Sequence, residues 1–231
     1  MLGIIGAMDE EVAKLKEKMV DVHVMKKASM EFFQGKLKGK EVVIVKSGIG
    51  KVNAAVCAQI LADDFKVSGL INTGIAGSLK NEINIGDLVL SSDVLYHDMD
   101  ATSFGYPLGQ VPRMEVLSFE ADKNLLSLAK ECCEKVNSEV KTFIGRVVSG
   151  DQFVSNKEKK DWILKKFNGC CTEMEGAAIA HTAYLNQIPF VIIRAISDKA
   201  DDSAHMDYPV FEALAIERSV KLIMEMAGEY E

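Results

Sequence analysis

Short apolar runs alternate along the chain with segments whose apolar residues recur at helical spacing. The runs at 2–6 and 190–196 are apolar at almost every position, and the second is rich in β-branched residues. Such continuous runs are typical of strands that are buried on both faces of a sheet. Residues 7–19 instead place Val12 and Leu15 at helical spacing, which predicts an amphipathic helix. The pattern therefore predicts strands and helices in alternation.

The same pattern continues through the rest of the chain. We expect further strands at 31–37, 41–46, 69–72, 86–96 and 143–149, and further helices at 51–65, 121–136, 156–167, 207–228 and after the sequence TEMEG. The strands on either side of Lys38-Gly39-Lys40 are predicted to form a hairpin, because glycine favours a tight turn. These elements predict an α/β fold, a single-domain three-layer sandwich in which helices flank a mixed central β-sheet.

Length and composition favour one domain over residues 1–231. No linker rich in Pro, Gly or Ser divides the 231 residues, and a chain of this length buries about 70–75% of the surface exposed when it is unfolded. The net charge of −7 argues against nucleic acid as a partner, because nucleic-acid-binding surfaces are clustered and basic. No apolar run reaches the roughly 18 residues of a membrane helix, and no signal sequence precedes the first strand. We therefore expect a cytoplasmic protein that does not bind membranes.

Carboxylates cluster in the stretch 172–202, where we expect the chemistry of this protein. Glu173 and Glu175 precede an apolar helix, while Ser197 and Asp198 follow the last predicted strand. Open α/β sheets bind ligands beyond the carboxyl ends of their strands. A partly dehydrated acid at that place has a raised pKa and can donate a proton. The same spacing also fits a structural role, in which the glutamates cap a helix and Asp198 opens a turn.

A partial dinucleotide-binding fingerprint stands at the N-terminus. It contains Gly3 and Gly6 but lacks the third glycine, and the acids at 9–11 occupy the helix start where a pyrophosphate would bind. We therefore expect no nicotinamide cofactor. Acids at a helix start stabilise its dipole, but Glu11 could instead face the crevice while its neighbours face water.

Two further glycine-rich segments follow predicted strands. GIGK at 48–51 lacks the spacing and the Ser or Thr of a phosphate-binding loop, so we interpret it as a loop that leads into a helix. Residues 73–77 close the strand at 69–72, and their two glycines allow close approach to a ligand or a positive φ. We expect the loop at 73–77 to lie in the same crevice.

A long segment at 97–113 shows no helical period and contains Phe104, Tyr106 and Pro112. Loops of this length without secondary structure are usually functional, and exposed aromatic residues are typical of an interface or a lid. The alternative is a loop that ordinary core aromatics hold in place.

Seven segments, taken in order, resemble the motifs of a known enzyme family. They are LGIIGAMDEEV, KSGIGKVNAA, INTGIAGS, YHDMDATSFGYPLGQVP, VSGDQF, TEMEGAAIAH and VIIRAISDKAD. Their shared order, from Leu2 to Tyr208, resembles the 5′-methylthioadenosine/S-adenosylhomocysteine nucleosidases. The resemblance implies the nucleoside phosphorylase-like α/β fold and hydrolysis of the N-glycosidic bond of these two nucleosides, and of 5′-deoxyadenosine, in methionine salvage. It also implies that the reaction needs no cofactor.

The resemblance implies a catalytic role for several residues. It makes Asp198 the donor that protonates the imidazole ring of the departing adenine, with Ser197 steadying its carboxyl group. Glu11 matches the acid that activates water, and Arg194 matches the arginine beside that water. Glu175 matches the residue that grips the ribose hydroxyls.

The resemblance also implies a set of binding residues and a partner subunit. Phe153 matches the ring that stacks on the purine. The implied substrate-binding residues of this subunit are Met8, Ile49, Ile75, Ala76, Gly77, Phe153, Val154, Glu173, Met174, Glu175 and Tyr208. Phe104, Tyr106 and Pro112 resemble the loop that completes the pocket of a partner subunit, so a homodimer is implied. Ile75 departs from the family pattern, because some members have a serine there near the water.

The residue types agree with cleavage of a glycosidic bond. Such a reaction passes through an oxocarbenium-like state, so one acid neutralises the leaving group while another carboxylate holds a water. We expect no metal ion, because the histidines show no ligand spacing; they are His23, His97, His181 and His205. No CxxC pair occurs among the five cysteines, which favours reduced structural thiols.

Three alternatives remain at this point. A purine nucleoside phosphorylase would need arginines that bind phosphate in a bidentate manner, but Arg194 alone among the arginines lies in a crevice motif. A futalosine-type nucleosidase of the same fold is the second alternative. A non-catalytic nucleoside sensor is the third, although it would have no need of a water-activating acid such as Glu11.

Overall fold

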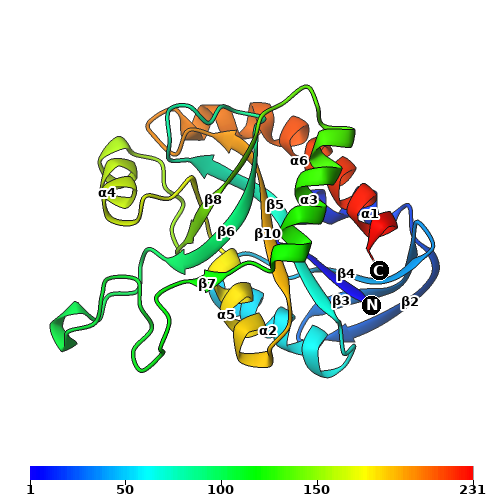
Figure 1. Ribbon diagram of the computed structural model, residues 1–231. Helices are drawn as coiled ribbons and strands as arrows, with labels where there is room; N and C mark the ends of the chain where they lie inside the picture. The colour runs from blue at the N-terminus through cyan, green and yellow to red at the C-terminus, as the bar shows by residue number, and fades with distance from the viewer. Residues whose placement is uncertain (231) are drawn as a thin grey trace.

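The computed structural model describes residues 1–230, with the backbone alone for Met206, and arranges them as a β-sheet between layers of helices (Figure 1). The strands are β1 (Leu2–Gly6), β2 (Val20–Lys27), β3 (Met30–Leu37), β4 (Lys40–Lys46), β5 (Gly69–Ser78), β6 (Leu88–Tyr96), β7 (Phe119–Glu120), β8 (Thr142–Ser149), β9 (Cys171–Glu173) and β10 (Phe190–Asp198). The helices are α1 (Asp9–Lys16), α2 (Lys51–Asp63), α3 (Lys123–Val136), α4 (Lys157–Phe167), α5 (Gly176–Asn186) and α6 (Ala204–Glu229), with a short 3-10 helix at Thr102–Phe104.

The strands of the described chain form one mixed sheet of ten strands. Parallel pairing joins β4, β1, β5 and β10, so the carboxyl ends of these strands lie on one edge. From β10 the pairing continues to β6, β8 and β9, and β9 pairs back onto the end of β5. These pairings close a circuit of strands, from which β1, β4, β3 and β2 extend as an open sheet. The circuit brings the segment after β9 to the ends of β5 and β10.

Helices cover both faces of the sheet. Helices α2 and α5 pack together on one face, α1, α3 and α6 cover the other, and α4 lies at one end (Figure 1). All residues of β10 are buried, as expected for a strand between two helical layers. Asp122 and Asn156 accept hydrogen bonds from backbone N–H groups at the starts of α3 and α4, which fixes where these two helices begin.

The predicted α/β sandwich and the hairpin of β3 and β4 are confirmed, and other elements differ in detail. Residues 73–77 were predicted to be a loop but belong to β5, which pairs with β10 through Gly77. Strand β2 was not predicted, although its alternating valines, VDVHV, are a usual strand signal. It lies at the open edge of the sheet, where none of its residues is buried. The short strands β7 and β9 were also not predicted.

The helix predicted over 7–19 is shorter in the structure, because α1 ends at Lys16. The last helix begins earlier than predicted, at Ala204. Of the described helices, none combines the length and the hydropathy that crossing a bilayer requires. The cysteines are all buried free thiols.

Candidate active site

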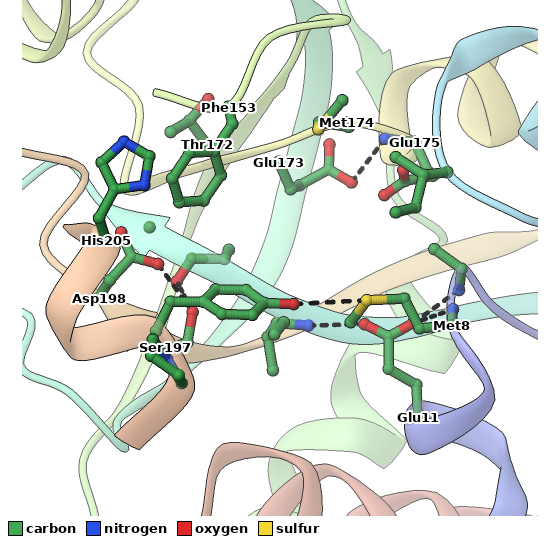
Figure 2. A pocket seen from close by; sticks show the side chains of 17 residues that line it. Met8, Glu11, Phe153, Thr172, Glu173, Met174, Glu175, Ser197, Asp198 and His205 are labelled. Carbon is green, nitrogen blue, oxygen red and sulfur yellow. Dashed lines mark hydrogen bonds between the residues drawn. The ribbon is translucent and has the colours of Figure 1, made fainter. Parts of the chain in front are cut away.

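A cavity of about 310 Å³ lies where β1, β5 and β10 end and where α1, α5 and α6 begin (Figure 2). Its wall consists of Ala7, Met8, Glu11, Ile49, Ile75, Ala76, Gly77, Phe153, Thr172, Glu173, Met174, Glu175, Ser197, Asp198, His205, Tyr208 and Pro209. The cavity therefore stands at the carboxyl ends of parallel strands, where open α/β sheets bind ligands.

Glu11 lies in the first turn of α1 and is 5% exposed. Its Oε2 accepts hydrogen bonds from the N–H groups of Ala7 at 2.6 Å and Met8 at 3.0 Å, and its Oε1 accepts one from Ile75 at 3.2 Å. Burial raises the pKa of Glu11, while the charge of Arg194 and these N–H donors oppose the rise. A carboxylate has about four lone-pair positions, so Oε1 keeps one for a water molecule or a ligand.

Two glycines of β5 make room for the acids. A Cβ atom at Gly74 would lie 2.5 Å from Oε1 of Glu11, and one at Gly77 would lie 2.8 Å from Oδ1 of Asp198. Both distances are shorter than real Cβ contacts, so a side chain at either position would displace a carboxyl group or the strand. The glycines therefore allow the acids to lie close to strand β5, and they are not needed for a turn.

Asp198 is the last residue of β10 and is 2% exposed. Its Oδ1 accepts a hydrogen bond from the N–H of Ala200 at 2.7 Å, and the hydroxyl of Ser197 donates to Oδ2 at 2.8 Å. Burial raises the pKa of Asp198 and these two hydrogen bonds oppose the rise, while the charges of Asp207 and Asp201 add to it. The carboxyl group thus keeps its proton to higher pH than an exposed aspartic acid, which suits a proton donor.

Glu173 lies at the centre of a buried hydrogen-bond network. The hydroxyl of Ser149 donates to its Oε1, while Oε2 accepts from the N–H groups of Glu175 at 3.0 Å and Gly176 at 2.7 Å. The guanidinium of Arg194 also donates to Oε2. With so many donors the carboxylate is held in one orientation, and it fixes the start of α5.

Arg194 was placed beside the water by the resemblance, but it does not line the cavity in this structure. The residue is 1% exposed, and its guanidinium donates to the side chain of Asn72 as well as to Glu173. Its positive charge lowers the pKa of Glu11 and of Glu175 against the effect of burial. Arg194 therefore acts on the cavity electrostatically, from behind the wall.

Glu175 directly precedes α5, and its Oε1 accepts a hydrogen bond from the N–H of Gly50 at 2.8 Å. Burial raises the pKa of Glu175 to about 8, and the charge of Glu173 contributes to the rise. The carboxyl group is therefore largely protonated at neutral pH and can both donate and accept a hydrogen bond. This acid comes to the cavity from a different element than Glu11 and Asp198, as Figure 2 shows.

Aromatic side chains also line the cavity. The ring of Phe153 lies 5.3 Å from the ring of His205 and 6.0 Å from that of Tyr208, measured between centroids. The hydroxyl of Tyr208 lies 3.4 Å from Sδ of Met8. Phe153 is 46% exposed and lines the cavity, so its ring is accessible to a planar ligand such as a nucleobase.

The structure brings most of the predicted site residues together around this cavity. Val154 is an exception, because its side chain is buried in the cluster beneath α4. Phe104, Tyr106 and Pro112 also do not line the cavity of their own subunit, and Phe104 is 83% exposed. The wall residues that the sequence did not predict are Ala7, Thr172, His205 and Pro209. Ala7 and Thr172 adjoin predicted motif residues, which was the signal available for them.

His205 and Pro209 belong to the first turns of α6, which the sequence predicted to begin later. Within residues 1–230, no three His, Cys, Asp or Glu side chains are grouped so that they could hold a metal ion. That the reaction needs no cofactor stays a prediction.

The α/β fold and the buried carboxyl groups at the ends of its strands are features that can be compared with those of known proteins. The model of the Phosphorylase superfamily matches residues 1–227 of the chain. The 5′-methylthioadenosine/S-adenosylhomocysteine nucleosidase of Staphylococcus haemolyticus is 42% identical over 224 residues, which are 96% of this chain and 97% of that protein.

Solved structures agree with this assignment. The same nucleosidase from Neisseria meningitidis, in complex with methylthio-immucillin-A, superposes with a TM-score of 0.95 at 38% identity and covers 99% of this chain and 98% of its own. A futalosine hydrolase of Helicobacter pylori superposes with a TM-score of 0.93 at 32% identity and covers 99% of this chain and 97% of its own. The chain therefore belongs to the phosphorylase superfamily and, within it, to the 5′-methylthioadenosine/S-adenosylhomocysteine nucleosidase family.

Proposed function

We propose that residues 1–231 form one catalytic domain that hydrolyses the N-glycosidic bond of 5′-methylthioadenosine, S-adenosylhomocysteine and 5′-deoxyadenosine. The products are adenine and the corresponding ribose derivative. The observation that carries this proposal is the cavity wall, which presents buried carboxyl groups from Glu11, Glu175 and Asp198. Of the described residues that form this wall, none is a lysine or an arginine.

Asp198 is the acid for the leaving group. The bond between the anomeric carbon and the purine nitrogen breaks with its electron pair going to the purine, and the proton of Asp198 neutralises the charge that develops there. Ser197 and the N–H of Ala200 hold the carboxyl group in place. Phe153 stacks on the purine ring and orients it toward the acid. Proton donation of this kind contributes about 10² to 10⁴ in rate.

Glu11 activates the water. Its three N–H donors hold the carboxylate and leave a lone-pair position on Oε1, which accepts a proton as the water oxygen bonds to the anomeric carbon. The contact from Ile75 uses the backbone N–H, so it does not depend on the side chain at the position where some family members have serine. The apolar side chain of Ile75 still lines the cavity.

Glu175 binds the ribose hydroxyls. A protonated carboxyl group can donate to one hydroxyl and accept from the other, and Gly50 holds its remaining oxygen. Met174 contributes its backbone beside the ribose, and Glu173 supports Glu175 through the N–H of that residue. Because these contacts orient the sugar between acid and base, they raise the rate through positioning.

Hydrolysis is favoured over phosphorolysis because the described residues of the cavity wall offer a phosphate no lysine or arginine. Arg146 pairs with Asp93, and Arg194 is buried against Glu173. A sensor without turnover would not need two acids with raised pKa values at separate places in one cavity.

A homodimer and a place in methionine salvage complete the proposal. Phe104, Tyr106 and Pro112 lie outside the cavity of their own subunit, which is consistent with a loop that completes a partner's pocket. We also propose that the protein is cytoplasmic, because its nucleoside substrates are by-products of intracellular S-adenosylmethionine reactions.

A futalosine-type nucleoside is the second candidate substrate, because the futalosine hydrolase of Helicobacter pylori shares the fold at 32% identity. The test incubates the protein with each nucleoside in phosphate-free and phosphate-containing buffer and measures the free base and the sugar by chromatography. We expect adenine and a free ribose product at equal rates in both buffers. Release of hypoxanthine alone would favour the futalosine-type substrate, and recovery of a ribose 1-phosphate would refute hydrolysis.

A further inference from the structure

A buried lysine outside the cavity, Lys160 of α4, reaches the loop that follows Asp198. Only 5% of Lys160 is exposed. Its Nζ donates to the backbone carbonyl of Lys199 at 2.6 Å and to Oδ2 of Asp201 at 3.3 Å. A buried ammonium group is costly unless it is paired and hydrogen-bonded, so these two contacts tie α4 firmly to the loop.

The bond from Lys160 and one of the bonds to Asp198 meet at a single peptide group. The carbonyl that accepts from Lys160 belongs to Lys199, and the N–H of the same peptide belongs to Ala200. That N–H donates to Oδ1 of Asp198 at 2.7 Å. A cation on the carbonyl side polarises the peptide and strengthens its N–H as a donor. Lys160 thus acts on the acid through one intervening peptide.

The conformation of this peptide depends on its surroundings. Ala200 has a φ of 51°, in the left-handed region that alanine rarely adopts, and it is completely buried. It lies in a cluster with Ile163 and Phe167 of α4. Backbone in such a conformation persists only where its neighbours hold it. Helix α4 supplies both the packing and the ammonium group that hold this peptide.

The loop also leads directly into the part of α6 that lines the cavity. Asp201 accepts a hydrogen bond from the N–H of Ser203 at 3.1 Å, and the hydroxyl of Ser203 donates to Asp207 at 2.5 Å. His205 and Tyr208 of the same helix start form part of the cavity wall. The contact of Lys160 with Asp201 therefore also holds the part of the loop that leads into α6.

We propose that Lys160 is a positioning residue for the leaving-group acid, which it orients through the peptide group between Lys199 and Ala200. The inference rests on the proposed function, since it concerns the step in which Asp198 protonates the purine. Lys160 does not touch the cavity, and its effect is on the direction of the Asp198 carboxyl group rather than on the water or the ribose.

The test compares two substrates that differ in their need for an acid. One is 5′-methylthioadenosine, whose purine must be protonated to leave. The other is the 4-nitrophenyl glycoside of 5-methylthioribose, whose leaving group departs as a stable anion. Rates are measured for the wild-type enzyme, for Lys160→Met, for Asp198→Asn as a reference, and for Lys166→Met as a matched control on the exposed last turn of α4.

Lys160→Met is expected to lower kcat for 5′-methylthioadenosine about tenfold or more, within the contribution of general acid catalysis. Its kcat for the nitrophenyl glycoside should stay within about twofold of wild type, and Asp198→Asn should show the same selectivity with a larger loss. Lys166→Met should leave both rates unchanged. Thermal unfolding of each variant establishes that it is folded; if Lys160→Met is not, Lys160→Gln takes its place in the same comparison.

An equal loss on the two substrates, or no loss on either, would overturn the role assigned to Lys160. Failure of the proposed function is a separate result, because the wild-type enzyme would then release no adenine from 5′-methylthioadenosine.

Discussion

Replacing Gly74 by alanine should displace the carboxyl group of Glu11, the acid that we propose activates the water. The added Cβ would lie 2.5 Å from Oε1 and 3.1 Å from Cδ of Glu11, whereas ordinary contacts begin at about 3.4 Å. The carboxyl group or strand β5 must therefore move by nearly 1 Å. Glu11 has little freedom to do so, because three backbone N–H groups hold it.

The size of the effect follows from this displacement. A misplacement of about 1 Å in a catalytic group can reduce the rate about 10²-fold. Overpacking of a filled interior also costs about 1–3 kcal/mol of stability. We therefore expect Gly74→Ala to fold, to lose about 10² in kcat, and to unfold at a lower urea concentration than wild type.

The assay measures adenine release from 5′-methylthioadenosine, with urea unfolding in parallel. Gly228→Ala is the control, because a Cβ there meets only Lys38 at 3.5 Å, and alanine favours the helix α6. This control should keep its activity and gain up to about 1 kcal/mol in stability. A Gly74→Ala enzyme with wild-type kcat would refute the argument that close approach of Glu11 to β5 matters for catalysis.

Three other predictions concern the acids and the aromatic loop. Asp198→Asn and Glu11→Gln should each lower turnover at least about 10²-fold yet still bind a substrate analogue by calorimetry; near-normal turnover of either would contradict its assignment. Because the pKa of Glu175 rises on folding from 4.5 to about 8, its stabilising contribution is complete below pH 4.5 and is lost as pH rises through 8. Glu175→Gln should therefore gain stability relative to wild type between pH 5 and pH 9 in urea unfolding, and a constant difference would argue against the shift. Phe104→Ala, at a side chain that is 83% exposed, should weaken substrate binding while the protein still sediments as a dimer, and a fully active monomer would exclude a shared pocket.

The alternation of apolar runs and amphipathic segments was enough to predict the class of fold. A strand such as β10 has to be apolar over most of its length because helices cover both of its sides, and this requirement is visible in the sequence. The place of the cavity could also be predicted. Glu175 precedes a helix and Asp198 stands at the end of a strand, and these ends meet at one edge of the sheet. Both inferences rest on local pattern, which the sequence contains in full.

Other features depend on contacts between distant segments. The glycines of β5 suggested a loop, and only the packing of Glu11 and Asp198 against the strand gives the reason for them. The ionic state of Glu175 follows from its burial and from the charges of neighbouring residues, neither of which spacing can reveal. Arg194 matched a motif position, but its hydrogen bonds to Asn72 and Glu173 hold it behind the cavity wall.

Lys160 illustrates the same limit most clearly. In the sequence it is one of several lysines of α4, and although it stands at helical spacing from Ile163 and Phe167, nothing there shows which groups its ammonium contacts. Its role arises because α4 packs on the loop after β10, where the carbonyl of Lys199 and the carboxylate of Asp201 compensate its buried charge. The sequence by itself determined which elements form and which acids stand at their ends. The tertiary structure decided which of these groups are dehydrated, paired and brought into contact, because burial and pairing depend on segments that are far apart along the chain.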